Sequence, residues 1–518
     1  MKALLMHPDR DFGVIPEPPP YRREAKPELP WYERELIKDL ELNTVLVAMA
    51  GDDEFLFDVA RTTLLSGLQN DADTILYRQE ILQDCVKNPA LIRELYDLAV
   101  QAIEAKRTSY FGIFNRSPGG ILSSSVELLK KFMGILRKLK SIADLHAGRL
   151  ESIGFTNLFA MLRSELSDEY FVSVQHHLKE LRFSGGALLS AELGPRNEGT
   201  NYVLRERRDK TPNWIKRLLG KPAFGYTFHL HPRDEAGARA ISELQDHGIN
   251  LVANAVAQST EHILSFFQML KTELGFYVCG LNLHDRLAEI DAPMCVPQPK
   301  PICTRLLHFN GLYDVCLALS MGRSIVGNSI EADNKDVVII TGANRGGKST
   351  FLRAIGLAQM MMQAGVFVGA ESYVGSCVQS LFTHYKREED PSMKKGKFDE
   401  ELSRMSTIVD AIAPNAMLLF NESFAATNER EGSEIARQVV CALLQARVRV
   451  FFVTHLYEFA RGLWGDKRDN ALFIRAERQA DGQRTFKLAP GEPLQTSFGA
   501  DLYEEIFGLG NTHLRALP

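Results

Sequence analysis

The sequence has few of the features that mark secreted, metal-bound or membrane-spanning chains. Its seven cysteines are odd in number and never spaced as Cys-x-x-Cys, which predicts reduced core thiols rather than a disulfide framework or a structural metal site. No apolar run approaches the roughly 18 residues that a membrane-spanning helix needs. Pro8 and Asp9 come too early for a secretory signal. These absences predict a cytoplasmic protein that contacts no membrane.

An excess of charge of one sign is also missing. Sixty Lys and Arg residues stand against sixty-five Asp and Glu, which gives a formal net charge of −5. This balance excludes a uniformly cationic nucleic-acid coat, although it leaves room for a local basic patch. Apolar residues make up 45% and charged residues 24% of the chain, as in folded globular proteins. The 518 residues are enough for roughly two to four domains.

The chain before about residue 290 is predicted to be mostly helical. Apolar residues recur at three- and four-residue spacing from about Tyr32 to Phe183, and again from Glu235 to Leu287. One such stripe consists of Leu122, Val126, Leu129, Met133 and Leu136. The lysines and arginines around this stripe indicate the solvated face of a bundle helix.

Proline marks two places where helix is not expected. The first thirty-odd residues contain EPPPYRREAKPELP, which favours an extended arm. A second cluster, from Pro293 to Pro301, follows the last helical pattern. It is the best domain boundary in the sequence.

Between about Ser184 and Leu230 the helical period fails, and short alternating segments predict strands. Residues 201–222 have a net charge of +5, with Tyr202 and Trp214 among the charges. The basic residues are Arg205, Arg207, Arg208, Lys210, Lys216, Arg217 and Lys221. Such a patch suits contacts with a phosphate backbone, which need charge but no base-reading geometry. An exposed loop whose charges only confer solubility is an equal alternative.

A glycine-rich loop follows a predicted buried strand. The letters DVVIIT lead into GANRGGKS, residues 342–349, and then into a helical pattern. This is G-x-x-x-x-G-K-[ST] in its required context, where backbone N–H groups converge on phosphate oxygens. Lys348 supplies a charge for the β- and γ-phosphates and Ser349 can ligate magnesium, so the predicted cofactors are ATP and Mg²⁺. The ATP-binding candidates are Gly342, Asn344, Gly346, Gly347, Lys348, Ser349 and Thr350.

Two further strand patterns end in polar residues. PNAMLLFNES ends at Asn421 and Glu422, where phosphate-loop ATPases usually have Asp and then Glu. Glu422 is the candidate general base. Asn421 is a weak candidate ligand for magnesium beside Ser349, because an amide oxygen brings no negative charge. VRVFFVTH delivers His455 at the sheet edge where α/β proteins bind ligands, which favours a γ-phosphate sensor over a structural histidine.

These residues resemble a known family. TGANRGGKSTFLRAIGLAQMMMQAGVFVGA is similar to the ATPase domain of MutS, the DNA mismatch-repair ATPase, whose loop also reads TG-x-N-x-GGKST. The resemblance continues through LFTH, KGKFDEELSRMSTIV, LLFNES and FFVTHLYEF to LQTSFGADLYEEIF, which is similar to the family's SYG helix. It is strong from about Asn328 to Phe507. It is weaker over the helical region, where DADTILYRQEILQD resembles the start of the family's core domain.

The resemblance implies a multi-domain fold: a mostly α-helical core and lever with a small β-containing clamp insert, followed by a C-terminal α/β P-loop ATPase domain of the ABC type. The implied divisions are a proline-rich arm over 1–31, a helical core and lever over 32–183, a clamp-like basic insert over 184–230, return helices over 231–290, a linker over 291–310 and the ATPase domain over 311–518. The resemblance also implies a homodimer that acts as an ATP-switched clamp on double-stranded or branched DNA, in DNA repair or recombination. Gly396, Lys397 and Phe398 would complete the ATP site of the opposite subunit.

The chain also departs from the family's pattern. Only about thirty proline-rich residues precede the helical region, without a Phe-x-Glu wedge, so mismatch reading by an inserted aromatic ring is not expected. We also expect no nuclease tail and shortened dimerising helices at the C-terminus. Gly396 and Lys397 stand where the family has Ser-Thr, Asn421 replaces an Asp, and SFAATNEREG replaces IGRGTST. We therefore expect ATP binding with slow hydrolysis, and mobility in KREEDPSMKKGK until nucleotide or a partner subunit orders it.

Two other classes of protein remain possible from the sequence. One is a nucleotide-binding scaffold that acts through protein partners instead of DNA. The other is the ATPase subunit of a membrane transporter, which shares the phosphate loop and a histidine in the position of His455. The long helical region and KGKFDEEL, which is not an LSGGQ-type signature, disfavour the transporter.

Overall fold

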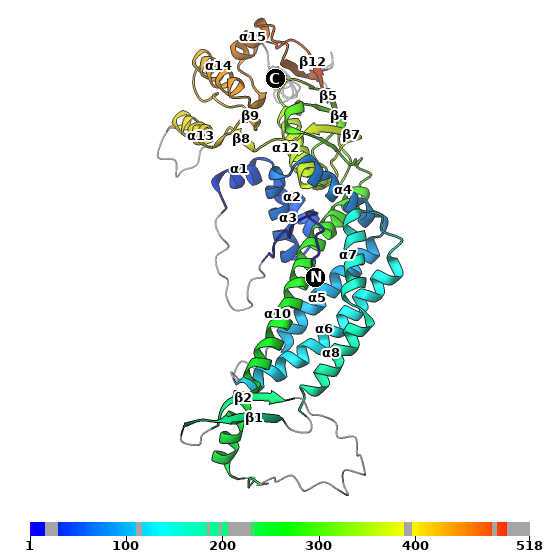
Figure 1. Ribbon diagram of the computed structural model, residues 1–518. Coiled ribbons are helices and arrows are strands. Elements are labelled where there is room, and N and C mark those ends of the chain that lie inside the picture. The colour runs from blue at the N-terminus through cyan, green and yellow to red at the C-terminus, as the bar shows by residue number, and fades with distance from the viewer. Residues whose placement is uncertain are drawn as a thin grey trace, which may run out of the picture. The chain divides into compact units, whose positions relative to one another are not determined.

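A computed structural model shows the chain as two compact units (Figure 1). The structure describes residues 1–15, 29–109, 117–183, 187–195, 199–205, 229–231, 233–387, 396–478 and 484–494. The first unit consists of Met1–Ala3, Arg93–Glu151 and Phe155–Lys271, and the second of Leu4–Ile92, Ser152–Gly154 and Thr272–Pro518. No helix of the described residues is long and apolar enough to cross a membrane. The predicted domain boundaries follow sequence pattern rather than contacts, and apart from the arm over 1–31 and the linker over 291–310 they stay a prediction.

The first unit is built on long helices that bury apolar stripes. Its helices are most of α5 (Pro89–Ser109), α6 (Pro118–His146), most of α7 (Ile153–Glu165), α8 (Asp168–Glu180) and the first part of α10 (Glu235–Ala288). The stripe predicted on α6 is buried at all five positions, which confirms this helix and its core face. Phe132 of α6 contacts Phe267 of α10, with ring centroids 5.8 Å apart. Ser117 caps α6 by accepting a hydrogen bond from the Gly120 N–H.

A short hairpin also belongs to the first unit. Strands β1 (Leu188–Leu193) and β2 (Gly199–Arg205) pair antiparallel, which confirms the strands expected in this region. Arg205 ends β2 with an exposed side chain, and its Nε donates a hydrogen bond of 2.9 Å to Ser190 Oγ. The other basic candidates, Arg207, Arg208, Lys210, Lys216, Arg217 and Lys221, lie outside the described residues.

The second unit begins with a segment that has no regular secondary structure and is nevertheless packed. Leu5 and Met6 are fully buried. The Leu5 N–H donates to Glu273, the Tyr277 hydroxyl donates to the Leu5 carbonyl, and Arg78 Nε donates to the Met6 carbonyl at 2.9 Å. Buried side chains therefore satisfy backbone groups that a helix or sheet would otherwise pair. The arm predicted over 1–31 is corrected for its first residues, which are part of the core.

Four short helices and one 3₁₀ turn follow in the second unit. They are α1 (Trp31–Asp39), α2 (Leu42–Ala50), α3 (Glu54–Ser66), η1 (Gly67–Gln69) and α4 (Ala72–Lys87). Asp53 and Asp71 cap α3 and α4 by accepting the N–H groups of Leu56 and Thr74. Gly67 lies so close to Ala364 that a Cβ atom there would come within 2.8 Å of the Ala364 Cα atom. This close approach packs the η1 turn on the end of α12 (Lys348–Ala364).

A four-stranded sheet corrects the predicted linker. Its order is β3 (Gln298–Lys300), β7 (Ser372–Ser376), β4 (Leu307–Leu312) and β5 (Asn328–Glu331), with η4 (Ile302–Thr304) between β3 and β4 and helix α11 (Val315–Met321) between β4 and β5. Residues 291–310 thus form β3, η4 and the start of β4 instead of a connection between domains. The prolines are tolerated because β3 is an edge strand that pairs with β7 alone.

A six-stranded sheet forms the centre of the second unit. Its order is β12 (Arg484–Pro490), β11 (Ala471–Arg478), β6 (Val337–Gly342), β10 (Arg449–Val453), β9 (Met417–Asn421) and β8 (Leu381–Tyr385), and β12 alone runs antiparallel to its neighbour. Figure 1 shows α13 (Lys397–Ala411), α14 (Glu429–Gln445) and α15 (Tyr457–Gly465) on one side of this sheet and α12 on the other. Strand β9 serves both sides, since Leu418 and Phe420 enter the core with α13, α14 and α15 while Leu419 meets Gly356 of α12. The expected α/β arrangement is confirmed here.

The seven cysteines all belong to the second unit and are free thiols. Those that are fully buried, as core thiols are expected to be, are Cys85, Cys279, Cys316 and Cys377. Cys303 is exposed, and so departs from this expectation.

Candidate nucleotide site

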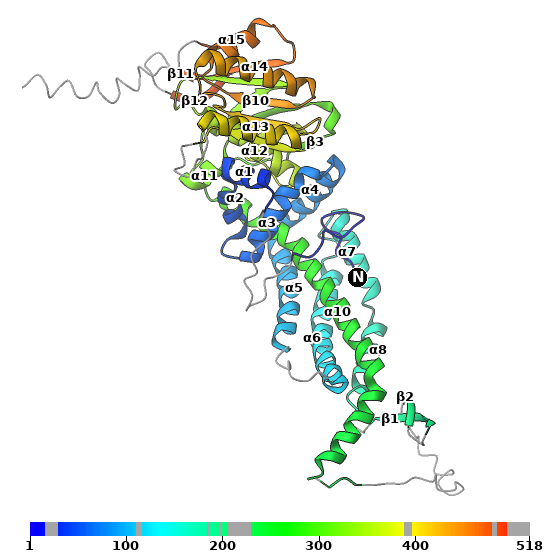
Figure 2. The ribbon, with the colours of Figure 1, turned by 90° about the vertical axis from the view of Figure 1, so that its left-hand side faces the viewer.

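The glycine-rich loop connects β6 to α12 as the sequence predicts. Figure 2 shows α12, α13 and α14 gathered around the sheet that contains β10. Gly342 and Gly347 have φ values of +111° and +86°, a backbone conformation that side chains disfavour. A Cβ atom on Gly342 would also come within 2.7 Å of the Ala476 backbone nitrogen on β11. Glycine at these positions lets the loop fold tightly over the end of the sheet.

Lys348, the first residue of α12, is held inside the loop. It is only 5% exposed, and its ammonium donates to the carbonyls of Gly342 and Ala343 at 3.1 and 2.9 Å. Burial lowers its pKa from the ordinary value, Glu422 opposes that shift and Arg484 adds to it. The loop therefore holds a desolvated cation whose present partners are neutral carbonyls that a phosphate could replace.

The predicted residues of the next strands converge on this loop. Strand β10 lies between β6 and β9, which brings the ends of the three strands together. Ser349 Oγ donates a hydrogen bond of 2.9 Å to Asn421 Oδ1 at the end of β9. His455 Nε2, just after β10, lies 2.9 Å from Glu422 Oε1. Residues from three distant parts of the sequence thus meet at one edge of the sheet.

The contact with His455 fixes the charge state of Glu422. This hydrogen bond holds the pKa of Glu422 below its ordinary value; burial opposes the effect, and the charges of His455, Lys348 and Lys386 add to it. Glu422 has a φ of +56°, and its N–H donates to the Val453 carbonyl at 2.9 Å. An anionic carboxylate is therefore held at the end of β9, in a backbone conformation that is uncommon for a residue with a side chain.

A cavity of about 740 Å³ opens beside the loop. Residues 344–350 and Glu422 form its polar wall. The apolar part of the lining consists of Leu312, Leu317, Met321, Ile325, Val326 and Phe486, and Asp314, Arg323, Ser324 and Asn328 also line the cavity. These apolar residues were not predicted from the sequence, because they come from the end of β4, α11, the following segment and β12, without a motif of their own. A mixed wall of this kind suits a ligand with a phosphate end and an apolar end.

The residues around Ser349 fit Mg²⁺ in spacing but not in charge. The oxygens of Ser349 and Asn421 are close enough to share an ion, yet both are neutral. Mg²⁺ in nucleotide sites is usually held by one or two carboxylates together with phosphates. Glu422, the nearest predicted carboxylate, is engaged with His455. The donor set is therefore a poor fit for the magnesium ion that the sequence predicts.

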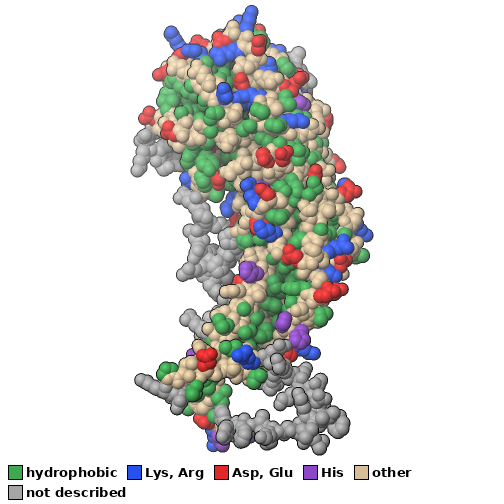
Figure 3. All heavy atoms as spheres, viewed as in Figure 1, with side chains coloured by type: hydrophobic (Ala, Val, Ile, Leu, Met, Phe, Trp, Pro, Cys, Tyr) green, Lys and Arg blue, Asp and Glu red, His purple; other side chains and the backbone are tan. Residues whose placement is uncertain are grey.

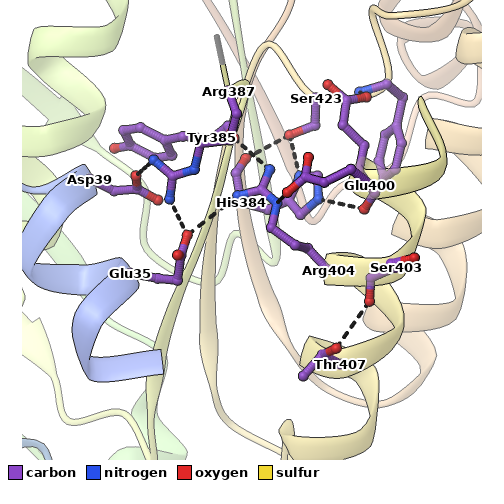
Figure 4. Close-up of polar contacts among 12 residues, drawn as sticks. Glu35, Asp39, His384, Tyr385, Arg387, Glu400, Ser403, Arg404, Thr407 and Ser423 are labelled. Carbon is purple, nitrogen blue, oxygen red and sulfur yellow. Dashed lines mark hydrogen bonds and ion pairs between the residues drawn. The ribbon is translucent and has the colours of Figure 1, made fainter. Parts of the chain in front are cut away.

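Charged side chains join β8 to α1 and α13, next to this site (Figure 4). Arg387 forms ion pairs with both Glu35 and Asp39 of α1, and Arg404 of α13 pairs with Glu400 at 2.9 Å. Figure 4 shows the Arg387 guanidinium between the two carboxylates of α1. The positive and negative side chains of this cluster thus mostly neutralise each other.

Gly396, Lys397 and Phe398 are the residues predicted to complete the ATP site of the opposite subunit. They begin the described segment that starts at residue 396. Gly396 is the exposed N-cap residue of α13, and Lys397 is the first residue of the helix. Phe398 packs against the core on the same side of the sheet as α14. Residues 388–395, which include most of the segment expected to be mobile, lie outside the described residues, as does most of the SYG-like segment.

Strand, glycine-rich loop and helix, with polar side chains at the ends of two neighbouring strands, define an α/β protein of the type that binds phosphate groups. Family comparisons give a more specific result. Residues 70–290 match the family model described as the MutS2 N-terminal domain, and residues 338–503 match MutS domain V. The chain belongs to the MutS family.

Curated relatives match parts of the chain. The DNA mismatch repair protein MutS of Leptospira interrogans is 27% identical over 265 residues, which cover 48% of this chain and 30% of the relative. The protein of the same name from Porphyromonas gingivalis is 34% identical over 167 residues, 31% of this chain and 19% of the relative. Human MutS protein homolog 4 is 29% identical over 259 residues, 48% of this chain and 26% of the relative. The chain therefore spans less than a third of the length of these relatives.

Proposed function

We propose that the chain is an ATP-binding protein that hydrolyses ATP slowly and holds double-stranded or branched DNA as an ATP-switched homodimeric clamp in DNA repair or recombination. One observation supports the nucleotide part above all others. Lys348, Ser349, Asn421, Glu422 and His455 converge at one edge of the sheet, beside a cavity whose lining has both polar and apolar parts. ATP with Mg²⁺ is the cofactor pair that membership of the MutS family favours.

The proposed reaction uses the chain's own residues as follows. The Glu422 carboxylate accepts a proton from the attacking water, whose oxygen bonds to the γ-phosphorus while the bond to the β–γ bridging oxygen breaks. His455 keeps the carboxylate oriented, since the two groups lie 2.9 Å apart. Lys348 exchanges its carbonyl partners for phosphate oxygens and neutralises the charge that develops on them. The products are ADP and phosphate.

Two features favour slow turnover. Asn421 adds no negative charge at the end of β9, and loss of one such electrostatic contact costs about 3 kcal/mol of transition-state stabilisation. The lowered pKa of Glu422 also makes its carboxylate a weaker base at neutral pH. Binding of ATP is therefore expected to be retained while the chemical step is slow.

The relatives support DNA as the partner. The Leptospira and Porphyromonas proteins are named for DNA mismatch repair, and we extend DNA binding to this chain as a proposal. Figure 3 shows Lys and Arg side chains interspersed with Asp and Glu on the viewed face, so no single-sign surface forms among the described residues there. The proposed contact therefore rests on the basic segment 201–222, of which Arg205 is exposed at the end of β2. The homodimer and the cytoplasmic location are likewise predictions.

A single-turnover assay with radiolabelled ATP, together with equilibrium binding, tests the nucleotide site. We expect Lys348→Ala to weaken ATP binding by at least about tenfold, because a buried charge facing the phosphates is lost. Asn421→Asp should speed the chemical step by about tenfold or more, because it restores a negative charge. Wild-type turnover that already matches an ordinary MutS protein, or Asn421→Asp without effect, would contradict slow hydrolysis. Unchanged binding by Lys348→Ala would contradict the site itself.

A further inference from the structure

A second cavity lies next to Ser349. It has a volume of about 320 Å³ and shares Ser349 and Thr350 with the larger cavity. Asn421 and Lys386 also line it. Ser349 and Asn421 are the residues that the sequence assigns to magnesium, so this cavity is where the positive charge that accompanies a triphosphate would lie.

The cavity is rich in cations. Four basic side chains line it, namely Lys38, Arg353, Lys386 and Arg387, against the acidic Asp39 and Glu41. Both acids are already paired, Asp39 with Arg387 and Glu41 with Arg353. Arg353 also pairs with buried Asp314. The arginines are thus compensated, whereas neither lysine has an ion-pair partner among the described residues.

Lys386 is the lysine that the fold ties to the catalytic strand. It follows β8, and its backbone N–H donates to the Asn421 carbonyl at 2.9 Å. Its side chain is exposed, and its charge is close enough to Glu422 to favour the ionised carboxylate. The backbone of Lys386 therefore holds its exposed ammonium close to Asn421, the residue that lacks the expected negative charge.

Asn421 and Lys386 act together on the choice of cation. A divalent ion in this cavity would meet the neutral oxygens of Ser349 and Asn421 and would be repelled by Lys386. Metal-free ATP carries more negative charge than its magnesium complex, so an ammonium without an ion-pair partner among the described residues attracts it more strongly. The same cavity that is unfavourable for Mg²⁺ is thus favourable for bare phosphate oxygens.

We propose that Lys386 supplies the positive charge on the Ser349 side of the triphosphate, so that the site binds ATP without Mg²⁺ about as well as with it. This inference rests on the nucleotide binding proposed above. It concerns which cation accompanies the nucleotide, and not whether the nucleotide binds.

Calorimetric titration of the full chain with ATP, in excess Mg²⁺ and in EDTA, tests the inference. For the wild type we expect the two dissociation constants to agree within about threefold, since the metal makes no charged contact with the protein. Lys386→Met should weaken binding in EDTA by about tenfold, which corresponds to about 1.4 kcal/mol. Lys467→Met is the matched control, because Lys467 is exposed in the turn after α15 and should change neither constant.

Asn421→Asp provides an independent measurement that keeps Lys386 in place. A carboxylate beside Ser349 should attract Mg²⁺ and repel free phosphate, so the ratio of the constants in EDTA and in Mg²⁺ should rise by at least about tenfold. If Lys386→Met melts at a lower temperature than the wild type, this ratio alone decides the question, and an unchanged ratio overturns the inference.

The outcomes separate the inference from the proposed function. Wild-type binding that is lost in EDTA overturns the role of Lys386 and leaves the nucleotide site intact. Equal constants for the wild type and a well-folded Lys386→Met variant in EDTA overturn it as well. No ATP binding by the wild type in either condition rejects the nucleotide site, and the inference falls with it.

Discussion

His384 lies within β8 and His455 follows β10, two strands of the same sheet that β9 separates. The two histidines differ in what surrounds them. His455 contacts Glu422 at the edge of the sheet. His384 is fully buried, and its Nε2–H donates to the Glu401 carbonyl at 3.0 Å while Nδ1 lies 2.7 Å from Ser423 Oγ. Burial lowers the pKa of His384 from 6.5 to about 4, and the charge of Arg404 adds to the shift. His384 is therefore neutral in the folded protein at physiological pH.

We predict that this histidine makes the second unit less stable in mild acid. The unfolded chain takes up the proton first, so stability is complete above pH 6.5 and is lost as the pH falls towards 4. At pH 5 the loss is about 2 kcal/mol for one such group. Thermal melts from pH 7.5 to 5 should show a smaller decline for His384→Gln than for the wild type. Part of the slope should remain, because burial also lowers the pKa of His7 to about 4.

The control for this prediction is an exposed histidine. His262 is exposed on α10, so His262→Gln should keep the wild-type pH slope. Equal slopes for His384→Gln and the wild type would show that the buried ring does not set the acid sensitivity.

Single residues of the site were predictable where a motif fixes them. Lys348, Ser349 and Glu422 occupy positions whose chemistry depends on local spacing, and the structure brings them together with Asn421 and His455. Their functional roles stay predictions. Lys386, Arg484 and Phe486 were not identified as site residues, because their approach depends on the pairing of β8 and β12 in the sheet rather than on neighbours in sequence.

At the scale of elements, helix α1 depends on the charged cluster at the end of β8. Arg387 pairs with Glu35 and Asp39, and Asp39 is only 6% exposed. Burial raises the pKa of Asp39, and the charge of Arg387 opposes this shift. Trp31 also stacks on Phe382 of β8, with ring centroids 6.2 Å apart. The helix is thus held by the contacts of Trp31 and Tyr32 with Phe382 and by the ion pairs of Glu35 and Asp39.

We predict that Arg387→Met loosens α1. The substitution leaves Asp39 buried without its partner, which costs about 3 kcal/mol. Amide hydrogen exchange over Trp31–Asp39 should become faster by a corresponding factor. Arg437→Met is the control, because its pair with Glu434 is exposed and screened by solvent, so its loss should leave exchange over α1 unchanged. Adding Asp39→Asn to Arg387→Met should restore part of the protection, and failure to do so would assign the effect to lost packing instead.

Elements were predictable where apolar periodicity carries the information. The stripe on α6 and the hairpin strands were expected and are present. The prediction of a linker over 291–310 was wrong. A cluster of prolines suggests a domain boundary, but a short edge strand also tolerates prolines. The packed segment before Phe12 was missed for a related reason. Its backbone is satisfied by distant side chains such as Glu273 and Arg78, which leave no local pattern.

At the scale of the whole molecule, the proposed DNA clamp predicts a strong dependence on salt. Each phosphate that a cation neutralises contributes about −0.9 to the slope of log K against log salt concentration. Neutralising Arg205, Arg207 and Arg208 to Gln should therefore make the slope shallower by about 2 to 3 on a duplex substrate. The matched control neutralises three exposed arginines of α14 and α15, namely Arg430, Arg437 and Arg461. Binding that is absent or insensitive to salt would favour a scaffold that acts through protein partners.

The proposed homodimer makes a prediction that no monomer can satisfy. If Lys397 completes the ATP site of the opposite subunit, Lys348→Ala and Lys397→Ala should each be inactive alone. A heterodimer of the two contains one site with an intact loop from one subunit and an intact Lys397 from the other. Random mixing makes half of the dimers mixed, so single-turnover activity should recover to about a quarter of the wild-type amplitude. Since Gly396 and Lys397 replace the Ser-Thr of the family signature, an inactive mixture of two well-folded variants would show that this trans contact has been lost, and an active Lys397→Ala protein would show that the site does not need it.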